Sequence, residues 1–147
     1  MKRQEKYKDT ATFHFYNANP KNKYTTDCLI RALSTGTGID YKVVVMELAK
    51  LQCETGYDYG DIRVYGKWLE QQGWKKHAQP RKWDNTKYTG KEFCKELNRY
   101  DCKIDDGNNR NRIIAHIGGH HIVAIMSCQI WDTWDSTEGC IGNYWTL

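Results

Sequence analysis

The sequence predicts an α+β fold, because helical patterns fill residues 28–99 while strand patterns are concentrated in residues 113–134. Helices and strands that are separated along the chain are typical of α+β proteins, whereas α/β proteins alternate them. A chain of 147 residues can bury a full core, so we expect a single domain over 1–147. The basic segment 1–9 precedes the first predicted element and is expected to be flexible.

Turn and capping signals divide the chain into its expected elements. In order, these are a strand over 10–16, helices that begin near Cys28, Asp40, Asp61 and Thr89, and consecutive antiparallel strands over 113–117, 121–126 and 130–134. The first helix can be capped by Thr26 or Asp27, and a glycine at 36 or 38 would end it. Thr89 and Glu92 have the spacing of a capping box for the last helix.

Cys28 is the candidate nucleophile. It opens the first predicted helix, within Asp27-Cys28-Leu29-Ile30-Arg31-Ala32-Leu33. Unpaired amides and the helix dipole at a first turn favour a thiolate over a thiol. The alternative is a buried cysteine that packs as a small apolar residue. A nucleophilic role would therefore require a histidine elsewhere in the chain to meet Cys28 after folding.

His121 is the candidate base, because it opens a predicted apolar strand and would lie at the edge of the core. His120 points to the opposite face, so the strand register decides which of the two histidines is active. If residues 127–128 form a two-residue turn, Asp132 becomes the diagonal neighbour of His121 on the same face. A longer turn would favour Asp135 instead.

Asn22, six residues before Cys28, completes the candidate site. Its amide could donate to the oxyanion of a tetrahedral intermediate, together with the backbone amide of Cys28. Asn22 also lies in an asparagine-rich turn, where a purely structural role is common.

The order of Cys28, His121 and Asp132, with Asn22 in place of the usual glutamine, resembles papain-like cysteine peptidases. The sequence Asp27-Cys28-x-x-Arg31-Ala32-Leu33 is most similar to leader-processing peptidase domains of bacteriocin exporters and to small papain-fold proteins of phages and bacteria. This resemblance implies a papain-like fold, in which a helical part that carries the nucleophile packs on a C-terminal antiparallel sheet. Because Asp132-Thr133-Trp134 resembles the Asn-Ser-Trp element of papain relatives, it also implies that the indole of Trp134 covers the partner of His121.

Other chemistries are less well supported. The residues His116, His120 and His121 could suggest a metal site, but Gly118-Gly119 argues against a helix that would align them, and the cysteines form no Cys-x-x-Cys pair. We expect no metal and no cofactor. A net charge of +4 does not by itself indicate a nucleic-acid binder, although Trp68, Trp74 and Trp83 lie among basic residues.

The sequence therefore predicts a cysteine peptidase that acts on a protein or peptide substrate through Cys28, His121, Asp132 and Asn22. Amidase or acyl-transfer chemistry would use the same groups. The alternative is a non-catalytic binding or inhibitor protein on the same scaffold. Membrane association is not expected, because no apolar run approaches the roughly 20 residues of a span. Without a recognisable secretory signal, we expect a cytoplasmic location.

Overall fold

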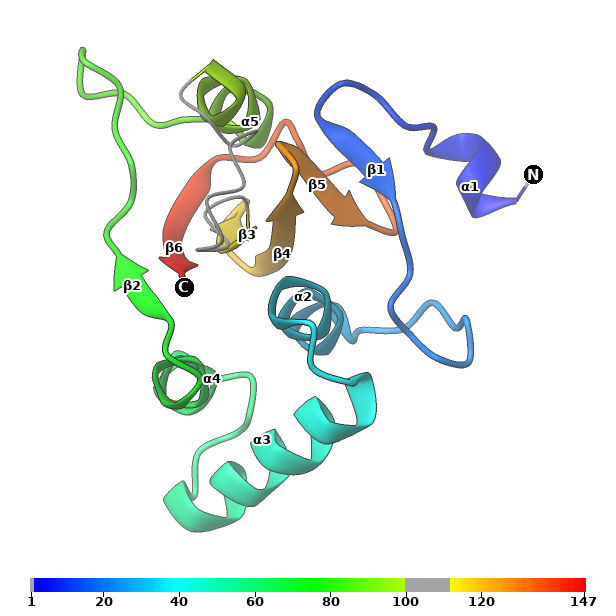
Figure 1. The fold of residues 1–147 in the computed structure, drawn as a ribbon, viewed down its shortest axis with the longest axis vertical. Helices are drawn as coiled ribbons and strands as arrows, with labels where there is room; N and C mark the ends of the chain where they lie inside the picture. Colours follow the sequence, from blue (N-terminus) through cyan, green and yellow to red (C-terminus); the bar gives the residue numbers. More distant parts are fainter. Residues whose placement is uncertain (1, 100–111) are drawn as a thin grey trace.

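The computed structural model describes residues 2–99 and 112–147, which form an α+β fold with helices on both faces of a mixed sheet (Figure 1). The predicted class is thus confirmed. The helices are α1 (Arg3–Lys6), α2 (Cys28–Thr37), α3 (Tyr41–Thr55), α4 (Ile62–Gln71) and α5 (Gly90–Arg99). The strands are β1 (Phe13–Phe15), β2 (Lys75–His77), β3 (Arg112–Ile117), β4 (His121–Met126), β5 (Gln129–Asp132) and β6 (Ile141–Thr146).

The sheet has the strand order β1-β5-β4-β3-β6-β2. Its centre, β3 to β5, is antiparallel as predicted, but β1 pairs in parallel with β5, so the sheet is mixed. Two strands were not expected. β2 is the polar segment Lys-Lys-His, and β6 contains Gly142 and Asn143, so neither shows a regular apolar alternation.

Each face of the sheet carries its own core. Ile114 of β3 and Ile122 of β4 pack against α2, α3 and α4. Ile113 and Val123, their neighbours along the same strands, face the opposite side and pack with Phe93 of α5. Helix α5 thus covers the far face of the sheet, opposite α2, α3 and α4 (Figure 1). The near-continuous apolar runs of β3 and β4 follow from this burial on both sides.

The β4–β5 hairpin turns through two residues, Ser127 and Cys128, both at positive φ (51° and 63°). This is the geometry of a type I′ turn, which matches the twist of an antiparallel pair. The resulting register pairs Ala124 with Trp131 and Met126 with Gln129. The predicted two-residue turn is therefore confirmed, and it brings Asp132 to the same face as His121.

Helix α2 packs closely against the sheet because its interior residue Gly36 has no side chain. A Cβ at this position would lie 2.6 Å from Cγ1 of Ile114, closer than carbon atoms approach without a shift. The helix ends at Gly38, which has φ 75° and donates its N–H to the carbonyl of Ser34. Close packing of α2 fixes where its first residue, Cys28, lies relative to β4.

The N-terminal segment has more structure than expected. Residues 3–6 form the short helix α1, and Nε of Arg3 donates to the carbonyl of Thr133 at 2.7 Å. The flexibility expected for 1–9 stays a prediction, while the side chain of Arg3 links the described part of this segment to the loop after β5. The capping box of α5 is confirmed, since Thr89 and Glu92 exchange bonds of 3.1 and 3.2 Å.

Candidate active site

The first residue of α2 meets the first residue of β4. Cys28 is half-buried, and its thiol lies beside the side chain of His121 and the backbone N–H of Ile122, which lower its pKa against the effect of burial. Both contacts follow from the packing of α2 across β4, the strand with which it makes its most extensive contact. Residues 93 positions apart in the chain are thus brought into direct contact.

Asp132 lies on the other side of the His121 ring. Nε2 of His121 and Oδ2 of Asp132 are 2.5 Å apart. Because Nε2 is bonded to Asp132, the ring nitrogen left to face the sulfur of Cys28 is Nδ1. The second oxygen of Asp132 accepts from Nη1 of Arg31 at 2.6 Å and from the backbone N–H of Thr133 at 2.7 Å. Asp132 is only 2% exposed, so its orientation is determined by these donors.

The three groups shift one another's proton affinities. Burial alone would raise the pKa of the Cys28 thiol, but the hydrogen bond and charge of His121 outweigh it and lower that pKa. Burial would likewise lower the pKa of His121, yet its bonds to Asp132 and Cys28 raise it to about 9. The pKa of Asp132 is lowered by His121 and Arg31 despite burial. Together these shifts favour the pair of a thiolate and an imidazolium over the pair of a thiol and a neutral imidazole.

The structure discriminates between the alternative residues. His120 is exposed, while His121 makes the contacts to Cys28 and Asp132. The carboxylate of Asp135 accepts from the N–H of Thr137 at 3.0 Å and from its hydroxyl at 2.6 Å, so Asp135 closes a local turn. The structure therefore brings His121 and Asp132, and not His120 and Asp135, together with Cys28.

Asn22 is placed differently from the other predicted residues. It is exposed in the loop before α2 at φ 52°, and its Oδ1 accepts from the amide of Asn17 at 3.3 Å. None of its contacts among the described residues reaches Cys28 or His121. The oxyanion role of Asn22 stays a prediction that this geometry does not support.

Trp134 covers the histidine. The rings of His121 and Trp134 have centroids 4.9 Å apart and are tilted by 39°. Beside them lies a mostly apolar cavity of about 150 Å³, which Ile117 and Ser136 also line. Because this cavity borders His121, a group bound in it would lie next to the imidazole ring.

Comparisons with models of protein families, with curated proteins and with solved structures found no match.

Arg31 is a residue of the candidate site that the sequence analysis did not single out. It is 8% exposed, and its Nε donates to Oδ1 of Asp27 at 2.9 Å while its Nη1 binds Asp132. Asp27 also accepts from Asn19 and Tyr41, at 3.0 and 2.6 Å. A signal was present in the sequence, because a lone arginine in the apolar run Leu29–Leu33, four residues after an acid, must find a partner if it is buried.

Other regions offer weaker candidates. Among the described residues, no group of three His, Cys, Asp or Glu side chains could hold a metal ion. Trp68 and Trp74 are buried in the core, so of the three tryptophans considered for base stacking only Trp83 is exposed. No helix in the described part of the chain is both long and apolar enough to cross a membrane.

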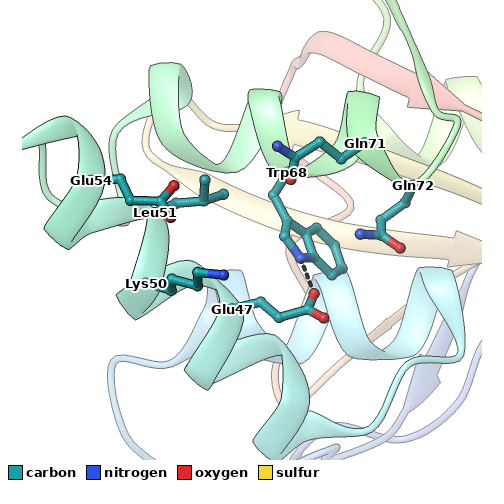
Figure 2. A pocket seen from close by; sticks show the side chains of 7 residues that line it. All are labelled: Glu47, Lys50, Leu51, Glu54, Trp68, Gln71 and Gln72. Carbon is teal, nitrogen blue, oxygen red and sulfur yellow. Dashed lines mark hydrogen bonds between the residues drawn. The ribbon is translucent and has the colours of Figure 1, made fainter.

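A groove of about 390 Å³ lies between α3 and α4, where Nε1 of Trp68 donates to Oε2 of Glu47 at 2.5 Å (Figure 2). The described side chains that line it are carboxylates, amides, an amine, a leucine and the indole. None of these is a thiol, hydroxyl or imidazole, so the groove holds no nucleophile paired with an imidazole base as at Cys28. The Cys28 site is the stronger candidate for chemistry.

Proposed function

We propose that this protein is a papain-like thiol hydrolase, most simply a cysteine peptidase that cleaves peptide or isopeptide bonds. The observation that carries the proposal is the continuous contact from the sulfur of Cys28 through the His121 ring to Asp132. A nucleophile bonded to a base, which is in turn oriented by a third group, is the arrangement that nucleophilic catalysis requires.

The chemistry follows from the two ring nitrogens. The Cys28 thiolate attacks the carbonyl carbon and forms a tetrahedral intermediate. Nδ1–H of His121 then protonates the leaving amine as the C–N bond breaks, which leaves a thioester on Cys28. Nδ1, now unprotonated, takes a proton from water, and the hydroxide attacks the thioester to release the acid and regenerate the thiolate. Asp132 holds Nε2–H throughout, because an ionised carboxylate can only accept.

The backbone amide of Cys28 is the donor best placed for the oxyanion. Amides in the first turn of a helix have no partner within the helix. The N-cap residue Asp27 does not bond them, since its carboxylate is engaged by Arg31, Asn19 and Tyr41 instead. The first turn of α2 is thus left available to stabilise negative charge beside the sulfur.

The proposal is tested by reactivity and by cleavage. Iodoacetamide at limiting concentration, followed by peptide mapping, should alkylate Cys28 faster than the exposed thiol of Cys53. The wild type should cleave peptides in a mixture of unrelated sequences. Cys28→Ala should cleave them less than a hundredth as fast, whereas the matched control Cys53→Ala should cleave them at the wild-type rate. This hundredfold criterion is a conservative bound on the large losses that follow removal of a nucleophile, about 10⁶-fold in one protease.

The opposite results would overturn the proposal. If Cys28 is alkylated no faster than Cys53, its thiol is not activated. If Cys28→Ala folds and retains the protein's biological effect, the non-catalytic binding protein becomes the better description. Product analysis separates the related chemistries, because a transferase would join the acyl group to an added amine where a peptidase releases a free acid.

A further inference from the structure

We infer that Arg31 is a positioning residue of the active site: it binds Asp27 and Asp132 at once and thereby holds His121 against Cys28. This inference rests on the proposed function, since it names a residue that controls the reactivity of the same thiol. Arg31 makes no hydrogen bond to the sulfur among the described side chains. Its charge also favours the thiolate directly, but its bonds reach the thiol through Asp132 and His121.

The contacts form one unbroken series. Asp27 accepts from Nε of Arg31 at 2.9 Å, Nη1 of Arg31 reaches Oδ1 of Asp132 at 2.6 Å, and Oδ2 of Asp132 lies 2.5 Å from Nε2 of His121. Cys28 follows on the other side of the ring. With His121 protonated, charges alternate in sign along the whole series, and each ion is bonded to ions of opposite charge.

The series spans the two halves of the site. Asp27, Cys28 and Arg31 lie on the N-cap and first turn of α2, whereas Asp132 ends β5. The bond between Arg31 and Asp132 therefore ties the helix that carries the nucleophile to the strand that carries the acid. Because Arg31 and the Thr133 amide occupy one oxygen of Asp132, the other oxygen is directed at His121.

The shape of the guanidinium is needed for this task. Arg31 uses two nitrogens of one rigid plane, Nε and Nη1, to reach two carboxylates. The side chains of Arg31, Asp27 and Asp132 are only 9%, 10% and 3% exposed. A lysine ammonium carries the same charge but has no fixed fork geometry. The single ammonium nitrogen of a lysine would bind only one of the two carboxylates, or both with poorer hydrogen-bond geometry.

The experiment compares Arg31→Met and Arg31→Lys with the wild type. The rate at which iodoacetamide alkylates Cys28 is measured from pH 5 to 10. Proton NMR follows the downfield signal of the His121 Nε2–H, the proton bonded to Asp132. Arg63→Met is the matched control, because Arg63 also pairs with an aspartate, Asp61, but on the exposed surface of α4. Circular dichroism and thermal unfolding show which variants are folded.

In folded Arg31→Met we expect alkylation at pH 7 to fall at least about tenfold, the effect of one unit of pKa, with the profile moved to higher pH and the downfield proton lost. Arg31→Lys should lie between Arg31→Met and the wild type, and it provides the test if Arg31→Met does not fold. Arg63→Met should match the wild type. A wild-type profile in either folded Arg31 variant overturns the inference, whereas an unactivated Cys28 in the wild type overturns the proposed function itself.

Discussion

The ring of His121 and the carboxylate of Asp132 are joined through Nε2 and Oδ2 at 2.5 Å. This bond fixes the tautomer of the ring, because an ionised Asp132 accepts and Nε2 must carry the proton. Nδ1 is then the ring nitrogen left to face Cys28, and the proposed chemistry assigns the proton transfers to it. Every later step of the proposed chemistry depends on this assignment of the two nitrogens.

Asp132→Asn should break the network even though it preserves the shape of the side chain. The amide presents one oxygen and one NH₂ group, so either Arg31 or His121 would face a donor in place of an acceptor. We expect the free energy of unfolding in urea to fall by about 3–5 kcal/mol, the usual result of removing one partner of a buried ion pair. Alkylation of Cys28 at pH 7 should also slow.

Asp135→Asn is the matched control, since Asp135 bonds Thr137 and makes no described bond to His121. It should alkylate at the wild-type rate. If Asp132→Asn also alkylates at the wild-type rate, Asp132 does not act on the thiol through His121.

The pH dependence of Cys28 should show two ionisations. Its pKa lies below the ordinary value of 9.0, so alkylation should already be appreciable near neutral pH and decline as acid protonates the thiolate. Peptide hydrolysis should decline again above about 9, where His121 loses the proton that the leaving group requires. Tyr65, the other titratable neighbour, stays protonated over this range because burial raises its pKa.

His121→Gln provides the control for this profile. Without the imidazolium, burial of Cys28 is opposed mainly by the amide of Ile122 and the charge of Arg31. The rise in alkylation should therefore move to higher pH, and hydrolysis should be lost. An unchanged alkylation profile would show that His121 does not activate the sulfur.

Two helix glycines should respond in opposite ways to alanine. At Gly36 the new methyl group would lie 2.6 Å from Cγ1 of Ile114, whereas at Gly66 the nearest atom, Cγ1 of Ile62, is 3.7 Å away. Gly36→Ala should cost about 1–3 kcal/mol through overpacking. Gly66→Ala should instead stabilise by up to about 1 kcal/mol, because alanine is the better helix former.

Urea unfolding measures both changes, and alkylation of Cys28 shows whether α2 has moved. Gly36→Ala should slow alkylation, since a shift of α2 displaces the sulfur from His121. If Gly36→Ala is as stable as the wild type, close packing at this point does not determine the position of α2.

The sequence predicted Cys28, His121 and Asp132 because local rules govern each of them. A helix start places the thiol, the head of an apolar strand places the ring, and a two-residue turn sets the register that selects Asp132 over Asp135. Arg31 could not be placed in the same way. Its two partners include Asp132, 101 positions later, and no local pattern encodes such a contact.

The fold likewise combines features that adjacent residues determine with features that depend on residues far apart in the chain. The capping box at Thr89 and Glu92 and the type I′ turn were predictable because their geometry depends on adjacent residues. β2 and β6 are strands only because they pair with each other and with β3. The position of α5 on the far face likewise follows from the burial of β3 and β4 on both sides of the sheet. A single sequence does not reveal such burial, because a short apolar run can be either a fully buried strand or a buried helix segment.

Stability should depend on pH through His121 and Asp132 in the Cys28→Ser variant, where the thiolate no longer contributes. Burial opposes it, but the pKa of His121 is raised in the folded state, most strongly by the bond to Asp132, which Cys28→Ser retains. Its contribution is therefore complete below the ordinary value of 6.5 and is lost as the pH rises through the folded-state value. Asp132 has a lowered pKa, so its contribution is complete above 3.8 and is lost as the pH falls further.

Both contributions are present together between pH 3.8 and 6.5, and urea midpoints should fall on the alkaline side of this window as His121 loses its proton. The double variant Cys28→Ser/His121→Gln serves as the reference, because it retains every other titrating group. Subtracting the urea midpoints of the double variant from those of Cys28→Ser isolates the contribution of His121 to stability. A difference that stays constant from pH 6.5 to 9 would mean that the folded protein does not hold the imidazolium more tightly than the unfolded chain does.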